Sequence, residues 1–253
     1  MAIPHLMEPI RKFNRFELKY LLSIEQVEEL KKDLEKYLLL DDHGNSGTYA
    51  ITSLYYDTED YRFYWEKIEG IKFRRKLRIR FYETIDKLTD DSIVFVEIKQ
   101  RTNKTVQKRR VALKYRDALL LCNERKIPPH DPRDSIVIEE ILSMLINYNL
   151  KPTLITSYFR KAYVGSDYDI GLRITFDTNI RYRINNLALD SKEIGNFLIS
   201  PDRSILEIKA NERIPYWVTK VIGHRNYRLI RISKYCTGLE AAQKVPNYAY
   251  EVY

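Results

Sequence analysis

Three Glu-x-Lys triplets lie in stretches of this sequence that have the composition of β-strands. They are Glu17-Leu18-Lys19, Glu97-Ile98-Lys99 and Glu207-Ile208-Lys209. Because side chains on a strand point alternately to opposite faces, each triplet places a carboxylate and an ammonium on one face and an aliphatic side chain on the other. Charge of both signs therefore recurs on one face of three separate strands.

A fourth stretch continues this pattern with a more basic face. From Lys76 to Tyr82, cations alternate with Leu77, Ile79 and Phe81. Strands of this kind that face one another would enclose a cavity rich in Lys and Arg. Guanidinium and ammonium groups form charge-assisted hydrogen bonds with phosphate oxygens, and carboxylates bind divalent cations. The pattern predicts a cavity for a polyphosphate and its metal ion, although one such strand alone could equally present a solvated face.

The candidate site residues are the charged side chains that these faces would share. The candidate cations are Lys19, Arg78, Arg80, Lys99, Lys108, Arg110, Arg160, Arg173 and Lys209, and the candidate carboxylates are Glu17, Glu97 and Glu207. Tyr158 shares a strand face with Arg160 and could donate a hydrogen bond to a phosphate. Glu97 could bind a metal ion, or could instead form an ion pair with Lys99 or Lys19. Phosphoryl transfer depends mainly on alignment and charge neutralisation, so no nucleophilic residue is expected.

About eight strands, with helices between them, are expected to position these residues. The strands are Arg11–Leu22, Tyr49–Asp57, Phe73–Glu83, Ser92–Arg101, Thr105–Lys114, Thr153–Gly165, Gly171–Asp177, Ile180–Ile184 and Ser204–Ala210, and the helices are Ile24–Leu40, Asp60–Ile68, Tyr115–Glu124, Ser135–Asn149 and Pro215–His224. The lack of regular βα alternation predicts an α+β fold, an eight-stranded and mainly antiparallel barrel with helices packed outside. The charged strand faces would then line its lumen.

Composition sets the class of protein and the kind of partner. The chain has 253 residues, 44% of them hydrophobic, and a formal net charge of +8, which favours an anionic partner. We expect residues 1–253 to form a single domain, with a core from about 13 to 241 and peripheral tails. With only Cys122 and Cys236, no signal peptide and no apolar run of about 18 residues, the sequence favours a cytoplasmic protein without a membrane span.

In their order along the chain, these motifs resemble the polyphosphate polymerase domain of the vacuolar transporter chaperone (VTC) family, within the triphosphate tunnel metalloenzyme (CYTH-like) superfamily. The resemblance runs from about Phe13 to Ala241. Its motifs are Phe16–Tyr20, Leu77–Tyr82, Glu97–Lys99, Lys108–Lys114, Tyr158–Tyr163, Leu172–Thr178, Leu206–Lys209 and Ser233–Tyr235. This chain has Phe81-Tyr82-Glu83 where the family often has Trp-Tyr-Gly, a departure that affects the local turn and leaves both arginines in place.

The resemblance implies an ATP-dependent polymerase that transfers the γ-phosphoryl group of ATP to a growing polyphosphate chain. Its ligands would be ATP, polyphosphate or pyrophosphate, and a divalent metal, most often Mn²⁺ with Mg²⁺ as the alternative; export of the polymer would need a membrane-protein partner. The residues assigned on this basis are Lys19, Arg78, Arg80, Lys99, Arg160 and Lys234 for catalysis, Lys108, Arg110, Tyr158, Arg173, Lys209 and Ser233 for substrate binding, and Glu207 and Glu97 for the metal.

Three other functions remain as alternatives, and the oligomeric state is open. A triphosphatase would use water as the acceptor, but such relatives tend to have Glu-x-Glu-x-Lys on the first strand, where this chain has Arg15 at the first position. A non-catalytic sensor of polyphosphate or inositol phosphates would gain little from Glu207. A nucleic-acid-binding barrel would carry its cations and exposed aromatics on an outer face, so nucleic acid is not an expected partner.

Overall fold

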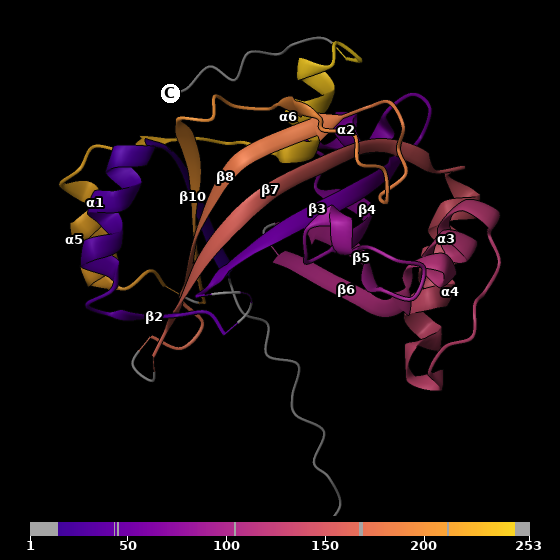
Figure 1. Ribbon diagram of the computed structural model, residues 1–253, viewed down its shortest axis with the longest axis horizontal. Coiled ribbons are helices and arrows are strands. Elements are labelled where there is room, and N and C mark those ends of the chain that lie inside the picture. Colours follow the sequence, from indigo (N-terminus) through magenta and orange to yellow (C-terminus); the bar gives the residue numbers. More distant parts are fainter. Residues whose placement is uncertain are drawn as a thin grey trace, which may run out of the picture.

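The computed structural model describes residues 15–245 apart from residues 43, 45, 104, 167–168 and 212. Eight long strands run through these residues: β1 (Arg15–Ser23), β3 (Thr48–Asp57), β4 (Phe73–Phe81), β5 (Ile93–Thr102), β6 (Thr105–Lys114), β7 (Lys151–Gly165), β8 (Arg173–Arg183) and β10 (Arg203–Asn211). They form one antiparallel sheet in the order β1–β10–β8–β7–β3–β4–β5–β6 (Figure 1). The short strands β2 (Leu38–Leu40), β9 (Asn196–Phe197) and β11 (Arg228–Leu229) pair with β7, β8 and β1.

The sheet curls into a tunnel. Lys99 Nζ on β5 lies 3.8 Å from Glu17 Oε2 on β1, although six steps in the strand order separate the two strands. Only a strongly curved sheet brings such distant strands together. Among the described residues β6 forms no ladder with β1 or β11, so the tunnel is curled rather than closed by hydrogen bonds. The predicted α+β fold with eight antiparallel long strands is confirmed.

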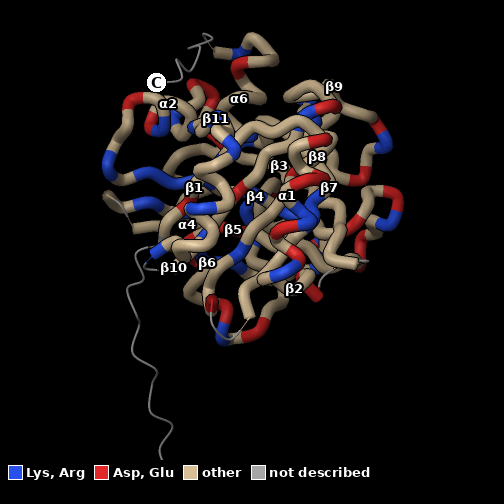
Figure 2. Tube along the Cα trace, turned by 90° about the vertical axis from the view of Figure 1, so that its left-hand side faces the viewer, with Lys and Arg blue, Asp and Glu red and all other residues tan. Residues whose placement is uncertain are grey.

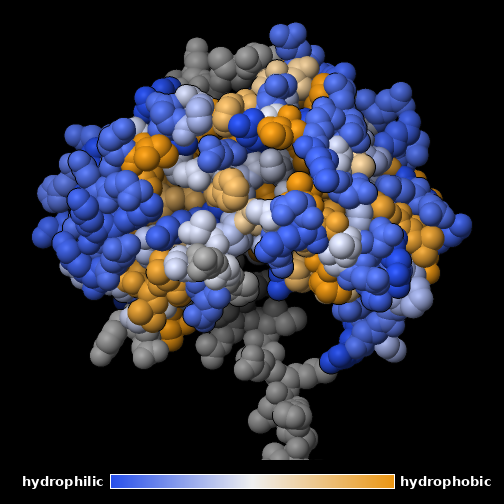
Figure 3. All heavy atoms as spheres, in the orientation of Figure 1, coloured by the Kyte–Doolittle hydropathy of each residue, from blue (hydrophilic) through white to orange (hydrophobic). Residues whose placement is uncertain are grey.

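The helices pack on the outer, aliphatic faces of the strands and at one end of the tunnel. They are α1 (Ile24–Leu34), α2 (Arg62–Ile68), α3 (Tyr115–Glu124), α4 (Ser135–Asn147), α5 (Tyr216–Gly223) and α6 (Lys234–Ala241), with short 3-10 turns at Ile85–Lys87 and Pro132–Asp134. Figure 1 shows α1 and α5 at one side of the sheet, α3 and α4 at the opposite side, and α2 and α6 at the top. In Figure 3, hydrophilic side chains cover both flanks of this face, with smaller apolar areas between them.

Two hydrophobic cores lie outside the lumen, as the alternating strands predict. One joins the outer faces of β4, β5 and β6 to α3 and α4, through residues such as Ile79, Val96 and Ile141. The other joins β1, β8 and β10 to α1 and α5, through residues such as Leu30 and Ile208. Because the aliphatic side chains are buried outward, the charged side chains at alternate positions face inward.

Two elements differ from the expected ones by more than a few residues, and α6 was not among the expected helices. The first helix begins as predicted, because Ser23 and Gln26 form a capping box, but it ends at Leu34 and not at Leu40. Leu38–Leu40 instead pairs with the end of β7, which satisfies its backbone and buries Leu38. The two strands expected at 171–184 are one strand, β8, because Asn179, at φ +49°, lies at a register shift that lets the strand continue. Residues 11–14 of the first expected strand lie outside the described residues.

Candidate functional site

The first cluster of the lumen is centred on Glu97, which is 1% exposed on β5. Arg78, its neighbour across the sheet, donates two hydrogen bonds to Glu97 Oε2, from Nε at 2.9 Å and Nη2 at 2.7 Å. Lys108 Nζ lies 2.7 Å from Oε1, and Arg80 Nη1 lies 4.0 Å from Oε2. Burial alone raises the pKa of Glu97, but these cations outweigh it and lower that pKa to about 2. Glu97 is therefore a carboxylate, and its predicted pairing with Lys99 or Lys19 is wrong.

The second cluster is centred on Glu207, which is 6% exposed on β10. Lys209 Nζ lies 2.9 Å from it, Arg160 Nη2 3.4 Å and Lys19 Nζ 3.5 Å. Lys19 also lies 2.9 Å from Glu17, so one ammonium is shared by two carboxylates. Burial opposes ionisation of Glu207, yet the three cations hold its pKa well below the usual range. Glu17 and Glu207 thus hold the ammonium group of Lys19 between them, at a position where a cation is favoured.

Asp177 on β8 is a buried carboxylate to which the sequence analysis gave no role. It is 0% exposed and accepts hydrogen bonds from Arg160 Nε at 2.6 Å, Arg160 Nη2 at 2.8 Å and Lys234 Nζ at 2.6 Å. Arg160 therefore bridges Asp177 and Glu207. Strand alternation could have indicated this position, because Asp177 is four residues after Arg173 and so shares its strand face.

Tyr158 on β7 gathers three of the predicted cations. Arg80 Nη2 lies 3.5 Å from its hydroxyl, Lys234 Nζ lies 4.5 Å from its ring centroid and the Arg160 guanidinium lies 5.3 Å from it. Ser53, which the sequence analysis did not select, accepts a hydrogen bond from Arg80 Nε at 3.0 Å. The aromatic face and the hydroxyl groups fix the directions in which these cations point.

The start of α6 delivers the last two predicted residues to the lumen. Ser233 caps this helix by accepting a hydrogen bond from the backbone N–H of Cys236, and its hydroxyl also accepts one from Lys76 Nζ at 3.0 Å. Lys234 follows at the first helical position and contacts Asp177. The residues preceding α6 are held on β1, because the N–H of Ile230 donates to the carbonyl of Lys19.

Among the described residues, two of the predicted cations contact neither carboxylate cluster. Arg173 binds Asp41 and donates to the Tyr49 hydroxyl at 2.9 Å. Arg110 is exposed and lies 4.6 Å from the ring centroid of Phe95, and among the described residues no carboxylate lies within ion-pair distance of it. The remaining predicted cations contact Glu17, Glu97, Asp177 or Glu207. Figure 2 shows basic and acidic positions on the strands inside the molecule as well as on the outer loops.

The lumen can supply two carboxylates to a metal ion, and no more than that. Among the residues that the structure describes, no three His, Cys, Asp or Glu side chains are placed to hold one. Glu17 and Glu207, on either side of Lys19, provide hard oxygen donors of the type that Mg²⁺ and Mn²⁺ prefer. Such ions are commonly held by one or two carboxylates together with substrate phosphates. The donor set therefore fits a divalent cation that arrives with a phosphate ligand.

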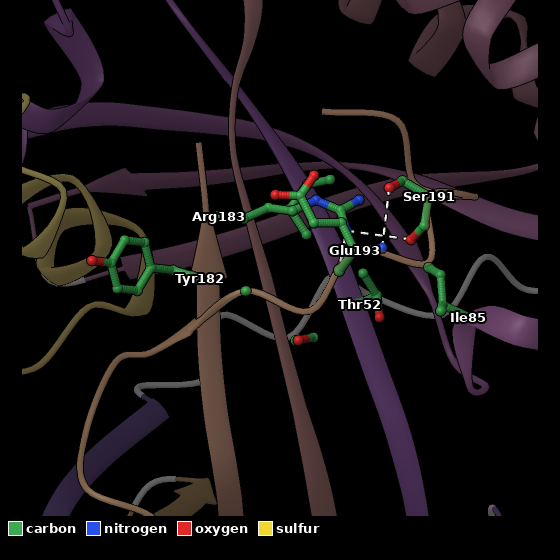
Figure 4. A pocket seen from close by; sticks show the side chains of 9 residues that line it. Thr52, Ile85, Tyr182, Arg183, Ser191 and Glu193 are labelled. Atoms are coloured by element: carbon green, nitrogen blue, oxygen red, sulfur yellow. Dashed lines mark hydrogen bonds between the residues drawn. The ribbon is translucent and has the colours of Figure 1, made fainter. Parts of the chain in front are cut away.

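A separate small cavity, of about 50 Å³, lies on the outer side of the sheet (Figure 4). Thr52 and Ser157 line it and alternate with Ser53 and Tyr158 of the lumen. Arg183 reaches it but donates to the backbone carbonyls of Ser191 and Glu193, which consumes much of its hydrogen-bonding capacity. Among the described residues, no hydrogen bond or ion pair joins the residues that line this cavity to Glu97 or Glu207.

Comparison with known proteins identifies the family. The VTC domain model matches residues 14–243. The chain belongs to the VTC domain family. A similar curated protein, vacuolar transporter chaperone complex subunit 4 of Trypanosoma brucei brucei, is 26% identical over 221 residues, which are 75% of this chain and 28% of that protein. This VTC chain therefore spans less than a third of that relative.

Solved structures of similar architecture have lower identity. A putative adenylate cyclase from Bacillus halodurans is 17% identical, with a TM-score of 0.46 over 83% of this VTC chain and 86% of that one. A putative adenylyl cyclase from Hippeastrum, described as having a dominant triphosphatase activity, is 13% identical, with a TM-score of 0.47 over 91% and 96%. No helix in the described part of the VTC chain combines the length and apolar character needed to cross a membrane.

Proposed function

We propose that this VTC domain is an ATP-dependent polyphosphate polymerase. The observation that carries the proposal is the set of guanidinium groups of Arg78, Arg80 and Arg160, which are buried or half-buried, are all directed into one lumen and pair with carboxylates that an anion could replace. A planar guanidinium binds two phosphate oxygens at once, so these residues suit successive phosphates of one chain. Membership of the VTC family supports the same substrate class.

In the proposed reaction, a terminal phosphate oxygen of the polymer attacks the γ-phosphorus of ATP. A new P–O bond forms while the bond to the β–γ bridging oxygen breaks, and ADP leaves with that oxygen. The attacking oxygen is already anionic, so no general base and no covalent enzyme intermediate are required. Arg78, Arg80, Arg160, Lys19 and Lys234 would align the two phosphate groups and neutralise the charge on the transferred group.

We further propose that Glu207 holds a divalent cation, Mn²⁺ or Mg²⁺, with Glu17 as its neighbour. When bound, this ion would neutralise phosphate charge as a Lewis acid. Glu97 was the second predicted metal ligand, and its position beside Arg78 and Lys108 suits it better to holding Arg78 in its binding orientation. Lys99, Lys209, Arg173, Lys108, Arg110, Tyr158 and Ser233 would extend the phosphate-binding surface.

The test is incubation of the purified chain with ATP and Mn²⁺, followed by gel analysis of the product. We expect a polymer that an exopolyphosphatase digests, with stoichiometric release of ADP. Release of orthophosphate without polymer would replace this proposal with a triphosphatase. Binding of ATP without any turnover, in the presence of Mn²⁺ or Mg²⁺ and a pyrophosphate primer, would instead favour a sensor.

The similar protein from Trypanosoma brucei brucei is named as a subunit of a complex, which suggests what kind of partner this chain has. Since that protein is a subunit of a vacuolar transporter chaperone complex, we propose that this chain also acts with other subunits, including a membrane protein that would take up the polymer. Affinity purification from its native cells, with and without a polyphosphate-degrading enzyme, would show whether such a subunit associates through protein contacts.

A further inference from the structure

Like charges face each other across the inner side of β4, β5 and β6. Arg74 is paired in register with Arg101, Lys76 with Lys99, and Lys99 with Lys108. We name these five residues the basic ladder. Directly opposed like charges destabilise an antiparallel sheet, and an ordinary surface would avoid them. Their repetition at neighbouring positions indicates a surface that is stabilised when an anion binds.

The basic ladder is neutralised at one end only. Lys108 contacts Glu97 at 2.7 Å, and Lys99 lies 3.8 Å from Glu17. Among the described residues, no carboxylate lies within ion-pair distance of Arg74 or Arg101. Burial, followed by the charge of Arg101, lowers the pKa of Arg74, as expected for a cation that faces another cation. The unbalanced charge is therefore concentrated at the end of the ladder away from Glu97.

Neighbouring elements add polar and positive groups to this end without adding a carboxylate contact to Arg74 or Arg101. Lys76 donates to Ser233 and lies 4.8 Å from the ring centroid of Tyr235. Lys67 on α2 is close enough to Lys76 and Arg74 that their charges, after burial itself, lower its pKa. The ladder therefore continues from the lumen to the edge of the tunnel beside α2.

Together with Arg78 and Arg80, the ladder forms a row of inner cations that suits a chain rather than a single triphosphate. The six residues from Arg80 to Arg74 along β4 cover about 20 Å at the usual rise of a strand. The side chains of Lys99 and Lys108 are 45% and 42% exposed, so a ligand inside the tunnel can reach them. Arg78 and Arg80 lie at the inner end, with the carboxylate clusters, whereas Arg74 and Arg101 lie at the outer end.

We propose that Arg74 and Arg101 bind the polyphosphate chain where it leaves the lumen, beyond the part of the tunnel that binds a triphosphate. This inference rests on the proposed function and adds the direction in which the polymer runs. An inorganic polyphosphate is favoured over a nucleic acid because the ladder presents cations side by side without an exposed aromatic among them on which bases could stack. Phe73, beside Arg74, is 45% exposed, but strand alternation places it on the opposite face of β4, and Tyr235 is covered by Lys76.

The test compares ligands of different length on a matched pair of double variants. Arg74→Gln with Arg101→Gln removes two charges from the ladder. Lys126→Gln with Arg133→Gln removes two exposed charges that pair with Glu124 and Asp131 beside α3 and α4, outside the lumen. Dissociation constants are measured by calorimetry for tripolyphosphate and for a polyphosphate of several tens of units, at two salt concentrations. We expect the ladder variant to lose about tenfold or more in affinity for the long chain, to keep its affinity for tripolyphosphate within about twofold, and to show a weaker salt dependence for the long chain.

The control variant should bind both ligands as the unmodified protein does. Equal losses for the two ligands, or no loss for the long chain, would overturn the ladder proposal. A single-stranded oligonucleotide that competes as well as polyphosphate, and that loses affinity in the same variant, would overturn the choice of ligand. Failure of the unmodified protein to bind tripolyphosphate would instead count against the proposed function, so the two failures are distinguishable.

Discussion

Arg160 shows how single residues hold this lumen together without a ligand. Its guanidinium is almost fully buried and contacts Asp177 and Glu207, two carboxylates from neighbouring strands. A buried charge is costly unless it is paired, so removal of one partner is more damaging than the net stabilisation of the pair suggests. Each lumen carboxylate thus has a structural role as well as any role toward a metal ion.

Glu207→Gln should abolish metal-dependent turnover, because the amide cannot replace the carboxylate as a cation ligand. Arg160 keeps Asp177, Lys19 keeps Glu17, and Lys209, which loses its carboxylate, is partly exposed to solvent, so we expect a moderate fall in melting temperature and a folded protein. Glu140→Gln is the matched control, since Glu140 pairs with Arg109 outside the lumen. Assays over a range of Mn²⁺ concentrations check this, and unchanged activity of the Glu207 variant would show that the ligand is misassigned.

Tyr55 should make phosphate binding depend on pH. Burial alone raises the pKa of its hydroxyl, but the charges of Arg78 and Arg80 outweigh it and lower the pKa to about 7. Above that pH the phenolate competes with phosphate for Arg78. The fold itself gains stability from this group as pH rises through 7 towards 10 and loses it as pH falls.

We expect tripolyphosphate affinity to decrease from pH 6 to 8.5, and less so in Tyr55→Phe; absorbance at the phenolate band checks the titration directly. Identical pH profiles for both proteins would contradict this assignment.

At the scale of elements, one carboxylate connects two strands and a helix. Asp177 on β8 accepts hydrogen bonds from Arg160 on β7 and from Lys234 at the start of α6. The position of α6 at the end of the tunnel therefore depends on a charge inside it. Tyr235, the next residue of α6, reinforces this position by donating to Asp57.

Asp177→Asn should destabilise the chain by about 3 to 5 kcal/mol, because two buried cations lose a charged partner. Tripolyphosphate should then raise the melting temperature of this variant by more than that of the unmodified protein, since the ligand supplies the missing negative charge. Thermal unfolding of both proteins, with and without tripolyphosphate, measures the two effects. A variant as stable as the unmodified protein would show that Asp177 does not balance these cations.

The periodicity of the strands predicted the fold and most of the lumen, and the exceptions have physical causes. Alternation assigned Lys19, Arg78 and Glu207 to the inner face correctly, because it depends only on backbone geometry. Partner choice could not be predicted, because Glu97 pairs with Arg78 and Lys108 as a result of strand order and register. The end of α1 was misjudged because Leu38 continues the apolar helical spacing but is buried by pairing with β7.

At the scale of the whole molecule, the described lumen carries more cations than carboxylates, so part of its positive charge is unbalanced when no anion is bound. A long anion contacts several of them at once, whereas a single phosphate contacts few. Duplex DNA is too wide for an eight-stranded tunnel. The net charge of +8 would attract polyphosphate, orthophosphate and DNA alike. Selectivity for polyphosphate must therefore come from the shape of the tunnel.

Tripolyphosphate should therefore raise the melting temperature more than an equal concentration of orthophosphate, and duplex DNA should raise it little at physiological salt. A thermal-shift series over the three ligands at fixed ionic strength makes the comparison. Equal shifts for DNA and tripolyphosphate would indicate binding on the outer surface and would contradict binding in the tunnel.

The position of β10 in the sheet also has a consequence for the synthesis of the chain. Among the described residues, both strands that pair with β1 come from the C-terminal part of the sequence, as in the pairing of Phe16 with Ala210 and of Tyr20 with Leu229. During translation β1 must wait for β10, the last long strand of the sheet, before it can pair, and such non-local pairing slows folding. Until then its basic face has no partner strand. Folding on the ribosome is thus expected to finish only after β10, which carries Glu207, has emerged and β1 has paired with it.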